Sequence, residues 1–166
     1  MTENALLHRN LHNVKVVSWG LTYLPQICSL LKVREYALGG SVAAYLYGID
    51  PERPIHDIDI IVPKGTILWV KCMVKDSPFF VEGVPSSTDA EFATNHYAIR
   101  TITGYIIDFI EAEDFSPIKS LGSIPVMPLE HLVKAKMMYS RDKDTSDEKK
   151  LVDLYNKLND KAKDIC

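Results

Sequence analysis

The amino-acid sequence predicts an α/β (α+β) fold, in which a small mixed β-sheet packs against flanking helices and a helical C-terminal portion follows. Stretches near both ends, residues 5–32 and 146–161, repeat apolar residues at helical spacing. Shorter runs of β-branched and aromatic residues lie between them and are bounded by Gly and Pro. We therefore expect a single structural unit, with residues 1–127 as the core with its N-terminal helices and residues 128–166 as a helical portion packed on it.

Composition and charge restrict the class of protein. The chain has 166 residues and a net charge of −3, and it lacks a long basic tract, so tight nonspecific binding to nucleic acid is not expected. Cys28, Cys72 and Cys166 are far apart and lack metal-ligand spacing, which excludes a disulfide scaffold and favours a reducing compartment. No apolar run approaches the roughly 18–20 residues that span a bilayer. We expect a soluble, cytoplasmic protein without membrane association.

The expected elements follow in chain order. Gly20 and Pro25 can break or kink the first helical stretch, which predicts one or two amphipathic helices. Next we expect a strand at 36–38, a helix at 42–47 ended by Gly48, an exposed loop at 50–56, a strand at 58–62, a helix at 67–74, a strand at 79–84 and a polar loop at 85–90. A hairpin at 96–103 and 105–111, an edge strand at 124–127 and a helix opened by Pro128 precede the last helix.

A glycine turn stands before the short helix. Gly39 and Gly40 permit positive φ angles and close backbone approach, and Ser41 occupies the expected N-cap position. The hydroxyl and the first free N–H groups of such a helix form a seat for phosphate. Glycine pairs are also common in ordinary tight turns, which is the alternative interpretation of this segment.

Three aspartates lie in the predicted strands. Asp57 and Asp59 are two residues apart, so a strand presents them on the same face, and Asp108 stands among apolar residues of a later strand. Each has a structural alternative: the pair suits an acidic edge strand, and Asp108 could be paired with Arg100 or a lysine. The combination with the glycine turn favours a functional site. Carboxylate oxygens suit Mg²⁺ better than imidazole does, so His56, His96 and His131 are interpreted as orienting or exposed residues.

Together, these residues resemble the DNA polymerase beta-like nucleotidyltransferase superfamily, particularly its small bacterial and archaeal members. The resemblance rests on Leu38-Gly39-Gly40-Ser41, on Asp57-Ile58-Asp59-Ile60, on Asp108 and on Arg53 before the aspartate pair. Lys136, Arg141, Lys143-Asp144 and Asp147 are similar to the lysine and Arg-x-Lys-Asp-x-x-Asp pattern of members found in toxin–antitoxin and phage-defence systems. The resemblance covers residues 21–158. The segment between Ser41 and Asp57 is a few residues longer than is usual in the family.

The resemblance implies a fold, cofactors and partners. The fold would be nucleotidyltransferase-like, and Asp57, Asp59 and Asp108 would be both the catalytic residues and the ligands of two Mg²⁺ ions, with Mn²⁺ as an alternative. The implied nucleotide-binding residues are Gly39, Gly40, Ser41, Arg53, Lys136 and Arg141. The implied partners are a nucleoside triphosphate such as ATP, an acceptor, and the partner protein of a toxin–antitoxin pair.

The predicted function is transfer of a nucleoside monophosphate from the triphosphate to an acceptor hydroxyl, with release of pyrophosphate. RNA is modestly favoured as the acceptor over a protein or a small molecule. The alternative is a noncatalytic nucleotide-binding or protein-binding partner, such as an antitoxin or regulatory subunit that retains the fold. The presence of all three aspartates favours the enzyme, because nothing in the alternative requires them.

Overall fold

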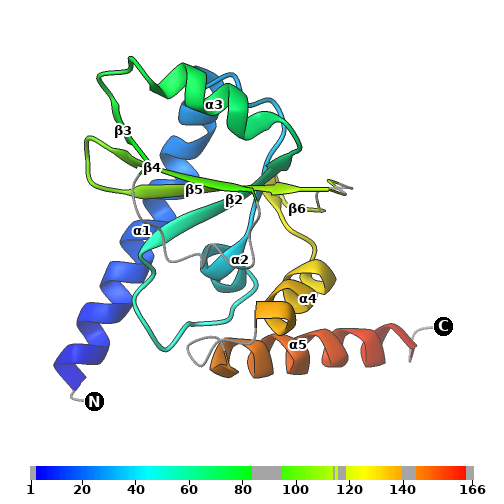
Figure 1. Cartoon of the computed structure of the whole chain (residues 1–166). Helices are drawn as coiled ribbons and strands as arrows, with labels where there is room; N and C mark the ends of the chain where they lie inside the picture. Colours follow the sequence, from blue (N-terminus) through cyan, green and yellow to red (C-terminus); the bar gives the residue numbers. More distant parts are fainter. Residues whose placement is uncertain (1–2, 84–94, 114, 116–118, 140–144, 164–166) are drawn as a thin grey trace.

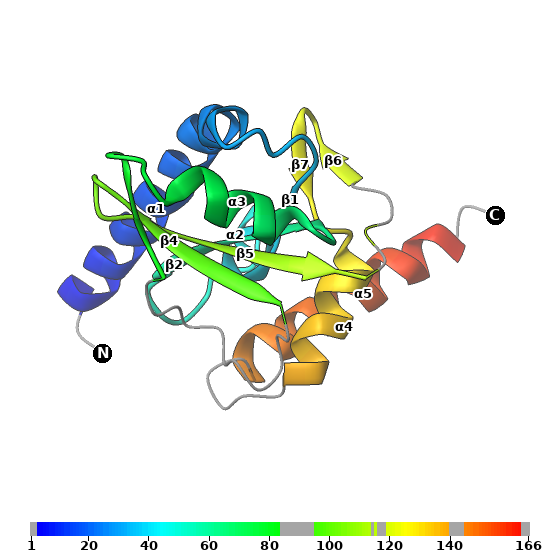
Figure 2. The ribbon, with the colours of Figure 1, turned by 45° about the horizontal axis from the view of Figure 1, so that its top comes forward.

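A computed structural model of the chain describes residues 3–83, 95–113, 115, 119–139 and 145–163. The described part begins with alternating helices and strands, continues with a run of strands and ends with two helices (Figures 1 and 2). The helices are α1 (Glu3–Leu30), α2 (Gly40–Leu46), α3 (Thr66–Val74), α4 (Leu129–Tyr139) and α5 (Thr145–Lys163). The strands are β1 (Ala37–Leu38), β2 (Asp57–Pro63), β3 (Phe80–Glu82), β4 (His96–Thr101), β5 (Ile106–Ala112), β6 (Lys119–Leu121) and β7 (Ile124–Val126). The predicted α/β class with a mixed sheet and C-terminal helices is confirmed.

All the strands of the described residues join one mixed sheet in the order β3-β4-β5-β2-β1-β7-β6. β2 pairs with β5 in parallel and β1 with β7 in parallel, whereas the other neighbours are antiparallel. β2 therefore lies in the middle of the sheet, not at an edge. This position contradicts the interpretation of Asp57 and Asp59 as acidic residues of an edge strand.

The two faces of the sheet are covered by different helices. Figure 1 shows α3 and the second half of α1 on one side, with α2, α4 and α5 on the other. The α1 and α3 side holds the larger apolar core, which includes side chains from β2, β4 and β5 that are fully buried: Ile58, Ile60, Val62, Ile99, Ile107 and Phe109. Burial of these side chains is a main source of stability for the fold.

The N-terminal stretch forms one continuous helix, α1, which runs through Pro25. Pro25 is exposed, so water can replace the backbone hydrogen bond that a proline removes. Gly20 lies close to the sheet: a Cβ there would stand 3.2 Å from Cδ1 of Ile58. A small residue thus lets α1 approach β2 closely. None of the described helices has the length and apolar content needed to cross a membrane.

The turn from β1 into α2 differs from the prediction. α2 begins at Gly40, its N-cap is Gly39, and no side chain caps it, so the expected capping role of Ser41 is wrong. Gly40 has a φ of +53°, which explains why the helix starts at a glycine. At the other end, Gly48 has a φ of +86°, and the N–H of Ile49 donates to the carbonyl of Ala44 at 3.0 Å. Gly48 therefore ends α2 as predicted.

The C-terminal part adds two strands and two helices. The strand predicted at the sheet edge is β7, and this prediction is wrong, because β7 is an inner strand that pairs with β1. The edge is formed by β6, a strand that the sequence pattern does not predict. α4 and α5 pack with α2 around a second apolar cluster that contains Ala43, Val126, Leu132 and Leu151. The predicted loop at 85–90 lies outside the described residues.

Candidate active site

Asp57, Asp59 and Asp108 lie on one face of the sheet. Asp57 and Asp59 alternate with the buried Ile58 and so point to the opposite face from it. In the parallel pairing of β2 and β5, Asp59 stands directly opposite Asp108. Asp108 is fully buried and Asp57 is 7% exposed. Two neighbouring strands thus bring three carboxylates together on the face that α1 and α3 do not cover.

We call Asp57, Asp59 and Asp108 the acidic group, and the glycine turn lies against it. The backbone N–H of Gly39 donates to the carbonyl of Asp59 at 2.9 Å. A Cβ on Gly40 would overlap Oδ2 of Asp59, far inside any permitted contact. Gly40 is therefore required both by its left-handed φ angle and by the carboxylate beside it. The predicted close backbone approach is present, and its partner is the Asp59 side chain.

His96 faces Asp108. Nδ1 of His96, at the start of β4, lies 3.2 Å from Oδ1 of Asp108. The two residues are diagonal neighbours on the same face, because Ala98 pairs with Asp108 across the strands. The sequence suggested Arg100 or a lysine as the partner of Asp108. Arg100 is exposed and pairs with Ile106, so the arginine prediction is not supported, and the printed contact of the Asp108 side chain is with His96.

A second group of polar side chains adjoins the glycine turn and contains two cations. Nη2 of Arg53 donates to Oγ of Ser41 at 2.9 Å. The same Nη2 lies 3.7 Å from Oδ2 of Asp147, at the start of α5. Nζ of Lys136, on α4, also lies 3.7 Å from this oxygen. The loop that follows α2 and the two C-terminal helices therefore converge beside α2. We call Ser41, Arg53, Lys136 and Asp147 the basic group.

Because the basic group is largely buried, each of its charges needs a partner of opposite charge. Asp147 is 1% exposed, Lys136 5% and Ser41 7%. Removing one partner of such a buried set leaves a charge without compensation, which is far more costly than losing a surface pair. Asp147 therefore holds both cations near the glycine turn. Because Gly40 touches Asp59 and Ser41 touches Arg53, the acidic and basic groups meet at adjacent residues.

The acidic group has the donor chemistry for a hard divalent cation. Among the described residues, no set of three or more His, Cys, Asp and Glu side chains is already arranged to hold a metal ion. Mg²⁺ is commonly bound by one or two carboxylates, several waters and the phosphates of a substrate, so a preformed cage of three protein ligands is not required. The oxygen donors of Asp59 and Asp108, opposite each other, fit this mode of binding.

The structure brings together most of the predicted site residues. Gly39, Gly40, Ser41, Arg53, Asp57, Asp59, Asp108 and Lys136 lie in the two adjoining groups. Arg141 lies outside the described residues. Asp147 entered the sequence argument only as part of a motif, and its place between two cations was not predicted. Its sequence signal is an acidic residue at the first turn of an amphipathic helix, which is also typical of ordinary helix starts.

Comparison with known proteins gives solved structures only, because no family model and no curated protein matches the chain. JHP933 from Helicobacter pylori is similar over 99% of this chain and 76% of its own, with 17% identity and a TM-score of 0.41. TM1012 from Thermotoga maritima, named a "putative nucleotidyltransferase", has 19% identity and a TM-score of 0.42, covering 84% of this chain and 94% of its own. An H. pylori protein with the same description has 14% identity and a TM-score of 0.37, covering 87% and 62% respectively.

These neighbours include proteins described by the activity that the sequence resemblance implies. Similarity at this level does not indicate what the present chain binds or transfers. What the chain can bind and transfer is set by its own acidic and basic groups.

Proposed function

We propose that the protein is a metal-dependent nucleotidyltransferase, which transfers a nucleoside monophosphate from a nucleoside triphosphate to an acceptor hydroxyl. The observation that carries the proposal is the meeting of the two groups at Gly40 and Ser41: carboxylates on one side, guanidinium and ammonium on the other. Phosphoryl chemistry needs both, because the substrate is anionic and the metal that accompanies it is cationic.

The basic group would bind the triphosphate. Arg53 offers a fork of donors suited to phosphate oxygens, and Lys136 supplies a compact positive charge. The hydroxyl of Ser41 and the backbone of Gly39 and Gly40 would complete the contacts, with Arg141 as a further candidate. Asp147 would keep Arg53 and Lys136 in place while the site is empty.

The acidic group would carry out the transfer. Asp57, Asp59 and Asp108 would hold two divalent cations, Mg²⁺ or Mn²⁺. When bound, these ions would lower the pKa of the attacking hydroxyl and neutralise the charge that develops in the transition state. The acceptor oxygen forms a bond to the α-phosphorus, and the bond from that phosphorus to the oxygen bridging the α- and β-phosphates breaks. Pyrophosphate leaves with the electron pair. Asp108 would accept the hydroxyl proton, and His96 would hold the carboxylate in orientation.

For the acceptor, we propose a class of molecule. An RNA acceptor is modestly favoured, and it would require a local basic patch because the chain is acidic overall. Lys136 is not part of such a patch, because it is 5% exposed and faces Asp147. Lys134 is exposed and paired with Glu130 on the same helix. Arg141 and Lys143, the remaining candidates, lie outside the described residues. Protein and small-molecule acceptors are the alternatives.

Pyrophosphate release tests the proposal directly. The full chain is incubated with each of the four ribonucleoside triphosphates, in Mg²⁺, Mn²⁺ or EDTA, with and without whole-cell extract as the source of acceptor. With at least one triphosphate, we expect pyrophosphate release that requires both metal and extract. This release should be absent in Asp59→Asn. A protein that binds triphosphate but releases no pyrophosphate under any of these conditions would instead be the noncatalytic partner.

A further inference from the structure

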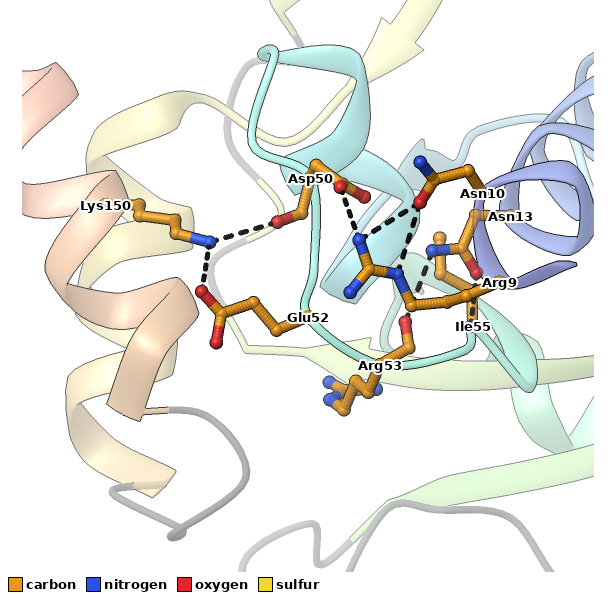
Figure 3. Close-up of polar contacts among 8 residues, drawn as sticks. All are labelled: Arg9, Asn10, Asn13, Asp50, Glu52, Arg53, Ile55 and Lys150. Atoms are coloured by element: carbon orange, nitrogen blue, oxygen red, sulfur yellow. Dashed lines mark hydrogen bonds and ion pairs between the residues drawn. The ribbon is translucent and has the colours of Figure 1, made fainter. Parts of the chain in front are cut away.

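The loop that carries Arg53, residues 47–56, is held from both sides by helices that are far from it in the sequence (Figure 3). On the α5 side, Nζ of Lys150 donates to the carbonyl of Asp50 at 3.3 Å and to Oε1 of Glu52 at 3.0 Å. The hydrogen bond from Lys150, and then its charge, lowers the pKa of Glu52. On the α1 side, Nη2 of Arg9 donates to Oδ2 of Asp50 at 2.9 Å. These are outer contacts, because Asp50 and Glu52 are exposed.

Asn13 makes a different, inner contact with the same loop. It is a fully buried polar residue on the inward face of α1, one turn before the buried Val16 and Val17. Its Oδ1 accepts the backbone N–H of Ile55 at 2.8 Å, and its Nδ2 donates to the carbonyl of Arg53 at 3.2 Å. The carboxamide thus binds the main chain on both sides of Pro54, a residue that has no N–H to offer.

We propose that Asn13 is a positioning residue for Arg53, the residue assigned above to triphosphate binding; the inference rests on that proposed function. Figure 3 shows the carbonyl of Arg53 turned toward Asn13 and its side chain turned away. A main chain fixed at residues 53 and 55 sets the direction in which the Arg53 side chain leaves the loop. At its far end, Nη2 meets Ser41 at 2.9 Å. A guanidinium that is already oriented loses less entropy when it binds phosphate.

A purely structural role for Asn13 makes different predictions. In that case the carboxamide only satisfies two buried backbone groups, and its removal lowers stability without changing how Arg53 behaves in the folded protein. The two roles are separated by measurements on Arg53 itself. The variant Asn13→Ala removes both hydrogen bonds. Asn13→Ser keeps a small polar group without adding a buried charge, but its shorter side chain cannot span both backbone groups, so it remains informative if Asn13→Ala fails to fold.

The first measurement does not depend on function. Phenylglyoxal modifies accessible guanidinium groups, and peptide mass analysis of the full chain gives the rate at Arg53. We expect both Asn13 variants to raise this rate several-fold, because the released loop lets Arg53 leave Ser41. Val17→Ala, which removes buried carbon atoms one turn along α1, serves as the matched control and should leave the rate unchanged. An unchanged rate in folded Asn13 variants would overturn the positioning role.

The second measurement is binding of inorganic tripolyphosphate with Mg²⁺, by calorimetry. We expect Asn13→Ala to weaken binding by about tenfold or more, the equivalent of one hydrogen bond to a charged group. In an Arg53→Ala background, Asn13→Ala should have almost no further effect, whereas independent effects would multiply and contradict the proposal. If the wild-type chain binds no triphosphate while the Asn13 variants still expose Arg53, the proposed function fails and the positioning role stands.

Discussion

The two faces of the β2 and β5 pair are built from alternating residues of the same strands, yet they carry opposite chemistry. One face holds Ile58, Ile60, Val62, Ile107 and Phe109, all fully buried beneath α1 and α3. The other face holds Asp57, Asp59 and Asp108, with the Asp59 and Asp108 backbones directly opposite each other. A shift of one residue in the pairing would exchange the two faces, so the apolar core fixes the position of the carboxylates.

Under the proposed function, this difference separates stability from activity within one pair of strands. Like charges on directly opposed residues disfavour the fold, whereas the apolar face stabilises it. The acidic face therefore makes sense as a site that the apolar face supports. Substitutions on the two faces should separate accordingly: changes on the acidic face should affect activity, and changes on the apolar face should affect the free energy of unfolding.

The largest expected effect is on the acidic face. Asp59→Asn should lower pyrophosphate release by on the order of a thousandfold or more, because a bound metal supplies several kcal/mol of charge stabilisation to the transition state. The melting temperature without metal should rise, since the substitution removes repulsion with Asp108. Parallel assays and thermal scans of wild type and variant check both results. Wild-type activity in Asp59→Asn would refute the assignment of the carboxylates.

The apolar face should give the reverse result. Ile60→Ala should lower the free energy of unfolding by about 2–5 kcal/mol, because Ile60 is fully buried and the surrounding core cannot collapse fully around the cavity. Urea unfolding measures this loss. At a temperature where the variant stays folded, activity per folded molecule should remain close to that of the wild type. A thousandfold loss of activity in the folded variant would show that the two faces are not separable.

Most of the fold could be predicted from local patterns, because strands, helices and turn glycines have short-range signals. The pairing of Asp59 with Asp108 was expected in outline, as three aspartates on strands of one sheet. Residues that act through tertiary contacts could not be predicted. His96 meets Asp108 only through the register of β4 and β5, and β6 is a three-residue strand without a pattern. Asn13 had one usable signal, a polar residue on the apolar face of a helix.

Gly40→Ala tests the contact between the glycine turn and the acidic face. A left-handed φ angle costs a residue with a Cβ about 1–2 kcal/mol, and the methyl group would also displace the Asp59 carboxylate. We expect a modest loss of stability with a larger loss of activity, measured by urea unfolding and pyrophosphate release. Gly48→Ala is the matched control, because Gly48 has a φ of +86° but a Cβ added there would meet nothing within 4 Å. Equal losses of activity in both variants would assign the effect to backbone strain alone.

The smallest expected effect is at Ser41, where the acidic and basic groups adjoin. Ser41→Ala removes the acceptor of the Arg53 hydrogen bond, and a hydrogen bond to a charged group contributes about 1.5–3 kcal/mol. Triphosphate binding should weaken less than turnover slows, because the backbone N–H groups persist when the hydroxyl is removed, and Asp147 still attracts Arg53. Calorimetry with an α,β-methylene triphosphate and single-turnover kinetics measure the two quantities. If both stay at the wild-type value, Ser41 only fills space beside α2, and the boundary between the groups lies at Gly40 and Asp59 alone.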